Sequence, residues 1–113
     1  MTEAAARKLA LSFPGAEERP HFERVSFKVA GKRGRHFCTL GQGTLSLKIE
    51  PRERLYAFLK DQPEVFIDLG GWTRMGSVGI RLSKVKEPFL RELMTEAWKR
   101  VASKRERAAF DAD

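Results

Sequence analysis

The apolar residues of the chain recur with two different periods, and each period predicts one kind of element. In the N-terminal segment they recur at the spacing of one helix face, at Ala6, Leu9, Ala10 and Phe13. This spacing predicts a helix over 3–13, with Thr2 as its N-cap and Pro14-Gly15 as its end. Segment 14–23 contains two prolines and has no period, so it is predicted to be a loop.

Three segments in the middle of the chain alternate between apolar and polar residues with a period of two. They cover 25–30, 35–40 and 44–50, and glycine-containing turns separate them. Such alternation is typical of antiparallel strands with one buried face, so it predicts a three-stranded meander. The alternation is blurred in the middle segment. Segment 77–82 predicts a final strand, and the apolar run 65–67 predicts another, with a helical turn as its alternative.

Two further helices are predicted after the meander. Pro51 begins a short one over 51–60, because a proline is tolerated in the first turn. A longer C-terminal helix begins near Pro88, and the basic residues from Lys99 to Arg107 are assigned to its far end. Its apolar face is continuous through Leu90, Leu93, Met94, Ala97, Trp98 and Val101. The segment 70–76 is predicted to be a loop, and the tail after Ala109 is predicted to be frayed.

This order of elements predicts a single α+β domain over residues 1–113. A helix, a meander, a short helix, one or two strands and a long helix do not alternate as a parallel sheet requires. One antiparallel sheet covered by helices is the simplest arrangement that buries every apolar face. The length of 113 residues is typical of one domain.

The charge balance gives the first indication of a partner. The chain has 22 Lys and Arg against 15 Asp and Glu, a net charge of +7. A positive field of this size attracts polyanions such as nucleic acid, although it also keeps a small protein soluble. One cysteine, no signal peptide and no long apolar run predict a cytoplasmic protein without a membrane segment.

Several strings of the sequence together resemble the MmcQ/YjbR family. They occur in the family's order and span nearly the whole chain: LSFPGAEE, SFKVAGKRGRHFCTL, GTLSLKIEP, DQPEVF, GGWTRMGSVGIRL and SKRERAAF. The resemblance implies a CyaY-like α+β fold, also described as a double-wing arrangement. It also implies DNA binding, which is the usual label of this family.

No pattern of catalytic or metal-ligating residues is present. The candidate ligands are His21, His36 and Cys38, and neither CxxC nor HExxH occurs. His36 and Cys38 stand two apart, so they are expected on the same face of a strand, but they lack further ligands nearby. Gly41-Gln42-Gly43 leads into a strand and is interpreted as a hairpin turn rather than a dinucleotide loop. The sequence therefore predicts no catalytic centre, metal or cofactor.

The remaining candidate chemistry is basic and aromatic. Between Arg24 and Arg35 five residues are positive and none is acidic, and three of them crowd one predicted hairpin tip. Such a hairpin can contact phosphates, although charged tips also discourage pairing between sheet edges. Trp72 can stack on a base, or it can close the edge of the core. The candidate nucleic-acid contacts are Lys28, Lys32, Arg33, Arg35, Trp72, Arg74 and Arg81.

The leading hypothesis is thus a non-enzymatic module that binds DNA or another nucleic acid through phosphate contacts. The alternative is a small-ligand or protein-interaction module that uses the Trp72 loop and the sheet face. The sequence leaves base specificity and oligomeric state open.

Overall fold

The computed structural model describes residues 1–29 and 35–112. Two predicted contacts, Lys32 and Arg33, lie outside the described residues. The elements follow in the order α1 (Glu3–Leu11), β1 (Ala16–His21), β2 (Arg24–Val29), β3 (His36–Gly41), β4 (Thr44–Lys48), α2 (Arg52–Asp61), β5 (Phe66–Ile67), α3 (Gly71–Arg74), β6 (Ser77–Arg81), α4 (Glu87–Val101) and α5 (Lys104–Asp111).

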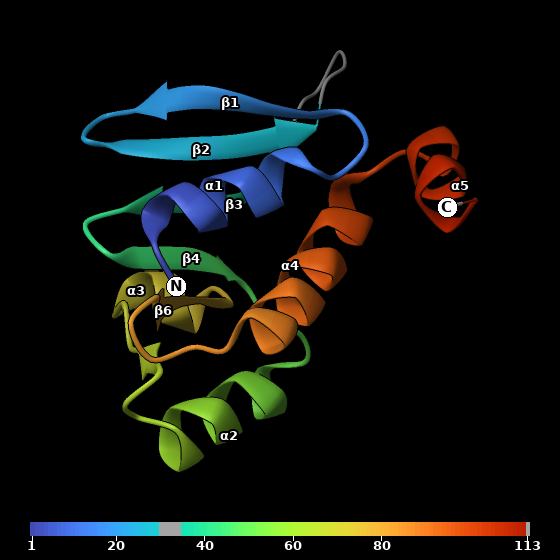
Figure 1. Ribbon diagram of the computed structural model, residues 1–113. Coiled ribbons are helices and arrows are strands. Elements are labelled where there is room, and N and C mark those ends of the chain that lie inside the picture. The colour runs from blue at the N-terminus through green and yellow to red at the C-terminus, as the bar shows by residue number, and fades with distance from the viewer. Residues whose placement is uncertain (30–34, 113) are drawn as a thin grey trace.

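The strands form one antiparallel sheet in the order β1-β2-β3-β4-β6-β5. Helices α1 and α4 lie on the same face of this sheet and both contact β3 (Figure 1). The hydrophobic core fills the layer between these helices and the sheet, as the alternating strands and the helical periods predicted. The α+β fold and the β2-β3-β4 meander are therefore confirmed.

Trp98 of α4 stands at the centre of this layer. Its side chain is fully buried, and its ring stacks on that of Phe13 with 5.4 Å between the centroids. The indole Nε1 donates a hydrogen bond of 3.1 Å to the carbonyl oxygen of Pro14. The polar atom of this large side chain is thus paired, as burial requires. Trp98 ties α4 to the end of α1.

The predicted loop over 14–23 is wrong, because it contains β1. This strand pairs with β2 from Ala16 opposite Val29 to His21 opposite Arg24. It lies at the edge of the sheet, and none of its side chains is fully buried. An edge strand can therefore lack an apolar alternation and can contain a proline. Backbone pairing, rather than side-chain burial, defines this element.

A β-bulge explains the blurred alternation of the middle strand. Phe27 is opposite Cys38, whereas the next residue, Lys28, is opposite His36, so Phe37 is the extra residue. Phe37 and Cys38 are both buried, while His36 is exposed. The expectation that His36 and Cys38 share one face is therefore wrong. Burial in the core also raises the pKa of the Cys38 thiol.

The C-terminal region forms two helices instead of one. Helix α4 ends at Val101, and the Ser103 side chain accepts a hydrogen bond from the Glu106 amide. The Glu106 carboxylate accepts a hydrogen bond from the Ser103 amide in turn, which completes a capping box. Helix α5 then continues to Asp111, beyond the point where fraying was predicted, and Phe110 packs against Phe13 and Trp98.

The segment predicted as a loop after β5 contains the short helix α3, which packs on β6. The short strand β5 confirms the predicted strand over 65–67. Among the helices of the described ranges, none is both long enough and apolar enough to cross a membrane.

Candidate nucleic-acid interface

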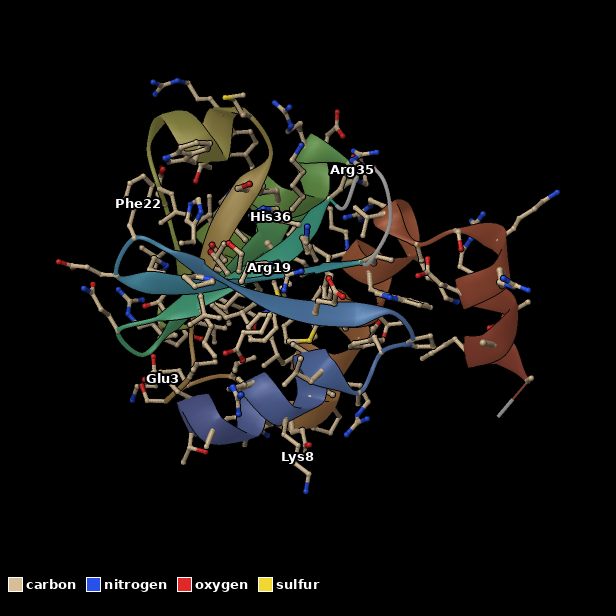
Figure 2. The ribbon with its side chains drawn as sticks, turned by 90° about the horizontal axis from the view of Figure 1, so that it is seen from above. Glu3, Lys8, Arg19, Phe22, Arg35 and His36 are labelled. Atoms are coloured by element: carbon tan, nitrogen blue, oxygen red, sulfur yellow. The ribbon has the colours of Figure 1, made fainter. Side chains whose placement is uncertain are left out.

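The face of the sheet opposite α1 and α4 is polar over its first four strands. One row of this face runs straight across the register through Arg19, Ser26, Thr39 and Ser46. Figure 2 shows Arg35 and His36 on this side, whereas Lys8 of α1 points away from the sheet on the other side. We refer to the outward side chains of β1–β4 as the open face.

Positive and imidazole side chains dominate the open face. Alternation along the paired strands directs six such side chains to this face: Arg19, His21, Arg24, Lys28, His36 and Lys48. Arg35 directly precedes β3. Glu17, which is ion-paired with Arg19 at 3.0 Å, is the single acidic residue that β1–β4 place on this side. The open face is therefore cationic in character, which favours contact with a polyanion.

Two arginines near this face are held by the fold. Arg24 donates to the carbonyl oxygens of Gly41 at 3.0 Å and Thr44 at 2.8 Å, and so it braces the β3–β4 turn. Arg81, a predicted phosphate contact, donates to the carbonyl oxygens of Pro63 at 2.9 Å and Glu64 at 3.3 Å. Both guanidinium groups stabilise loops, which makes them weaker candidates for a partner.

Lys28 and Lys48 are the accessible cations of the open face, and Arg35 lies at its edge, in the wall of a notch beside the start of β3. Lys28 is half-buried on β2, whereas Arg35 and Lys48 are exposed. Within the described residues none of the three forms an ion pair or donates a side-chain hydrogen bond. Since their charges are not neutralised by a neighbour, these three residues are the best-placed phosphate contacts. Two of them were predicted from the sequence, and Lys48 was not.

His21 and His36 lie close together on the open face. Their ring centroids are 5.7 Å apart with an edge-to-face angle of 75°. Ser26 lies on the strand between theirs and is fully buried, and its hydroxyl has no partner among the described residues. Partial burial, the charge of His21 and the charge of Lys28, in that order, lower the pKa of His36. His36 is therefore mostly neutral at pH 7 and gains charge in acid.

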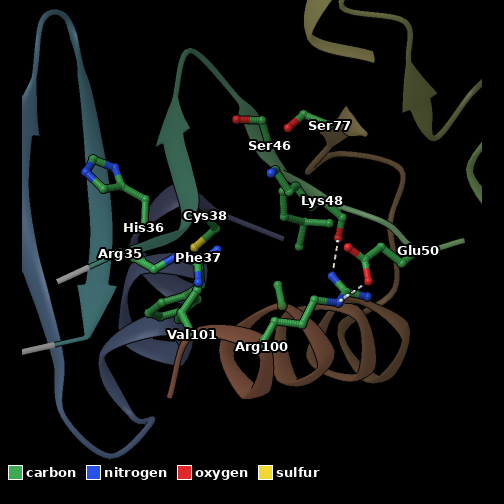
Figure 3. A pocket seen from close by; sticks show the side chains of 12 residues that line it. Arg35, His36, Phe37, Cys38, Ser46, Lys48, Glu50, Ser77, Arg100 and Val101 are labelled. Carbon is green, nitrogen blue, oxygen red and sulfur yellow. Dashed lines mark hydrogen bonds and ion pairs between the residues drawn. The ribbon is translucent and has the colours of Figure 1, made fainter. Parts of the chain in front are cut away.

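A notch opens where β3 and β4 separate. Their ladder ends at the pair Thr39 and Ser46, and a cavity of about 710 Å³ lies between the diverging strands and the end of α4. Arg100 of α4 donates to the Lys48 carbonyl oxygen at 3.0 Å and is ion-paired with Glu50 at 3.4 Å (Figure 3). The same view shows the His36 ring turned away from Cys38. Arg35 and Lys48 both line the notch.

The predicted Trp72–Arg74 group forms a separate exposed site. Trp72 is 67% exposed, so it does not close the core edge; Thr73 of the same helix is buried instead. The Thr73 hydroxyl oxygen accepts a hydrogen bond of 2.7 Å from the amide of Leu69, which fixes α3 over β6. This places Trp72 and Arg74 beyond β4, away from the strands that bear Lys28 and Arg35.

Sequence reasoning did not assign Arg19 and His21 to this face, because both lie in the segment predicted as a loop. Their face is defined only by the register of β1 on β2, for which the sequence carries no hydrophobic signal. Among the described residues, no three His, Cys, Asp or Glu side chains come together in a way that could hold a metal ion.

Comparison with known proteins places this small α+β domain in a family. The model of the YjbR family matches residues 11–100, and the chain therefore belongs to the YjbR family. The crystal structure of the Deinococcus radiodurans protein DR2400, a DUF419 domain, is similar to it with a TM-score of 0.77. That comparison covers 96% of this chain and 86% of the other at 24% identity, so it supports the fold. No curated protein matches the sequence.

Proposed function

We propose that the protein binds nucleic acid through the phosphate contacts of its open face. The observation that carries this proposal is the charge asymmetry of β1–β4, which direct six basic or imidazole side chains and one acidic side chain outward. Lysine and arginine on an accessible sheet face can lie against phosphates without reading bases. Affinity then comes mainly from the release of counterions, and sequence preference is weak.

Lys28, Arg35 and Lys48 are the principal contacts in this proposal. Lys32 and Arg33, which lie outside the described residues, remain contacts predicted from the sequence. The Trp72–Arg74 group is a secondary contact that a longer strand can reach. The membership in the YjbR family, whose common label is DNA binding, agrees with this proposal.

A titration with labelled single-stranded and duplex DNA at 50 mM and 200 mM salt tests the proposal. Each neutralised phosphate contributes a slope of about −0.7 to −0.9 in log K against log salt, so the three principal contacts predict a loss of affinity of roughly 20-fold to 40-fold between the two concentrations. No binding to either DNA at 50 mM salt would refute the proposal.

A small anionic ligand in the notch is the second candidate function. The cavity has the size of ligand pockets in general, with apolar Phe37 and Leu47 in its wall and Arg35 and Lys48 at its side. It differs from the predicted pocket at Trp72, because it lies between β3 and β4. Binding of an anionic metabolite with a salt dependence much weaker than that expected for DNA, without binding of DNA, would favour this function.

A further inference from the structure

Phe22 has an unusual position at the tip of the β1–β2 hairpin. It follows His21, the last residue of β1, and only Glu23 separates it from Arg24, the first residue of β2. Its side chain is 97% exposed, the highest value among the large hydrophobic residues of the described ranges. Its backbone has φ of 58°, in the left-handed region. Figure 2 shows Phe22 at the far end of the hairpin.

Both properties of Phe22 are unfavourable for folding. Glycine and asparagine adopt a positive φ more readily than a residue with a bulky side chain, and they are the usual residues of such turns. The exposed phenyl ring is not stabilised by burial, and its aromatic neighbour is His21, with 5.2 Å between the ring centroids and 76° between the ring planes. Bulky residues held at a positive φ cluster at ligand-contact sites, and here the strained position also presents an exposed aromatic ring.

The surroundings of Phe22 indicate which partner it fits. The hairpin tip continues the open face, because Arg19 and His21 lie on the same strand and the same side. A patch for a membrane or an apolar protein groove would need further apolar side chains, yet the neighbouring tip residues are His21, Glu23 and Arg24. A single aromatic ring beside a row of cations is instead the combination that binds single-stranded nucleic acid.

We propose that Phe22 stacks on an unpaired base of a nucleic acid whose phosphates lie along the open face. This inference rests on the proposed function, and it adds a preference for single-stranded or locally unpaired nucleic acid. The hairpin tip provides the stacking platform, and Lys28 and Arg35 neutralise the backbone. Because stacking needs only the flat face of a base, the contact is insensitive to sequence.

Photocrosslinking to an oligothymidylate that carries 5-iododeoxyuridine tests this contact residue by residue. Irradiation joins this base to an aromatic side chain stacked on it, and mass spectrometry identifies the joined peptide. We expect the crosslink on Phe22. Crosslinks confined to Tyr56 or Trp72, which are also exposed, would overturn the inference while leaving nucleic-acid binding intact.

Affinity measurements on F22L separate stacking from charge. This variant keeps an apolar side chain but lacks the ring, so its affinity for the oligonucleotide should fall about tenfold, with the salt slope unchanged. Y56L, which removes an exposed ring from α2, should bind like the parent. An F22L protein with parental affinity would refute the stacking contact, whereas a parent that fails to bind at low salt would refute the proposed function as well.

The F22G variant tests whether a loss of folding, rather than the loss of the ring, causes the lower affinity. Since glycine relieves the positive φ, F22G should unfold at the same temperature as the parent or higher, and it should still lose about tenfold in affinity. Binding of the parent to anionic vesicles, lost in F22L, with no Phe22-dependent binding of the oligonucleotide, would overturn the inference in favour of a lipid surface.

Discussion

His36 on β3 lies directly opposite Lys28 on β2, and the bulge at Phe37 creates this pairing. The charge of Lys28 is one of the causes that lower the pKa of His36, after burial and the charge of His21. A like charge and partial burial both disfavour the imidazolium form. The position of His36 opposite Lys28 therefore places a titratable side chain within the candidate interface.

The binding of nucleic acid should strengthen as the pH falls below 7. Protonation of His36 adds a positive charge to the open face beside Lys28, and each added cation near a phosphate increases affinity. The H36Q variant should lose this part of the pH dependence while keeping the affinity of the parent at pH 8. Fluorescence anisotropy at constant ionic strength across pH 5–8 measures both. Equal pH profiles of the two proteins would show that His36 does not face the ligand.

Stability should change with pH in the opposite direction. Because the pKa of His36 in the folded protein is below its ordinary value of 6.5, the unfolded chain takes up the proton first as the pH falls. The contribution of His36 to the free energy of unfolding is therefore full well above pH 6.5, and it is lost as the pH falls from 6.5 through the pKa of the folded protein. Urea unfolding at pH 7.5 and pH 5 should show a smaller decrease in H36Q than in the parent.

Replacement of Trp98 should destabilise the fold more than any change on the open face. W98A removes a fully buried side chain that stacks on Phe13, and such truncations cost about 3–5 kcal/mol. W98F should cost less, about 1–3 kcal/mol, because it keeps an aromatic ring but leaves the carbonyl of Pro14 without its donor. Chemical denaturation of both variants checks the order; a W98A protein as stable as W98F would contradict this account of the core.

The break between α4 and α5 depends on Ser103. S103A removes the side-chain oxygen that accepts from the Glu106 amide, and loss of an N-cap costs about 1 kcal/mol. We expect faster hydrogen exchange at the first amides of α5, with exchange in α4 unchanged. Equal acceleration through both helices would indicate one continuous helix, as the sequence period predicted.

Much of the fold could be predicted because burial leaves a period in the sequence. The hydrophobic periods predicted α1, α4 and the meander, but they gave no signal for β1, whose side chains are not fully buried. The boundary before α5 is marked in the sequence by Ser103 and Glu106, which have the spacing of a capping box. The bulge at Phe37 depends on pairing with β2 and is not visible in β3 alone.

The candidate site was predictable only where charge is dense along the chain. Lys28 and Arg35 flank the basic hairpin and were found, whereas Lys48 and His21 come to the same face through strand pairing. Arg81 follows the alternation of its strand, but its hydrogen bonds to Pro63 and Glu64 become known only once the loop is placed. Residue spacing gives the face of a strand, and only the register gives its neighbours across the sheet.

The central claim is that the open face, rather than total charge, binds nucleic acid. A triple variant, K28A/R35A/K48A, removes three cations from this face and its edge, and K8A/K84A/K86A removes three exposed cations elsewhere. Both variants have the same net charge, so they differ only in where the charge is lost.

The slope of log K against log salt for binding to oligothymidylate is the most direct measurement. Three lost phosphate contacts should reduce the slope by about 2 in the open-face variant, while the control variant should keep the slope of the parent. Equal slopes for the two variants would contradict the account, because total charge alone would then explain the binding.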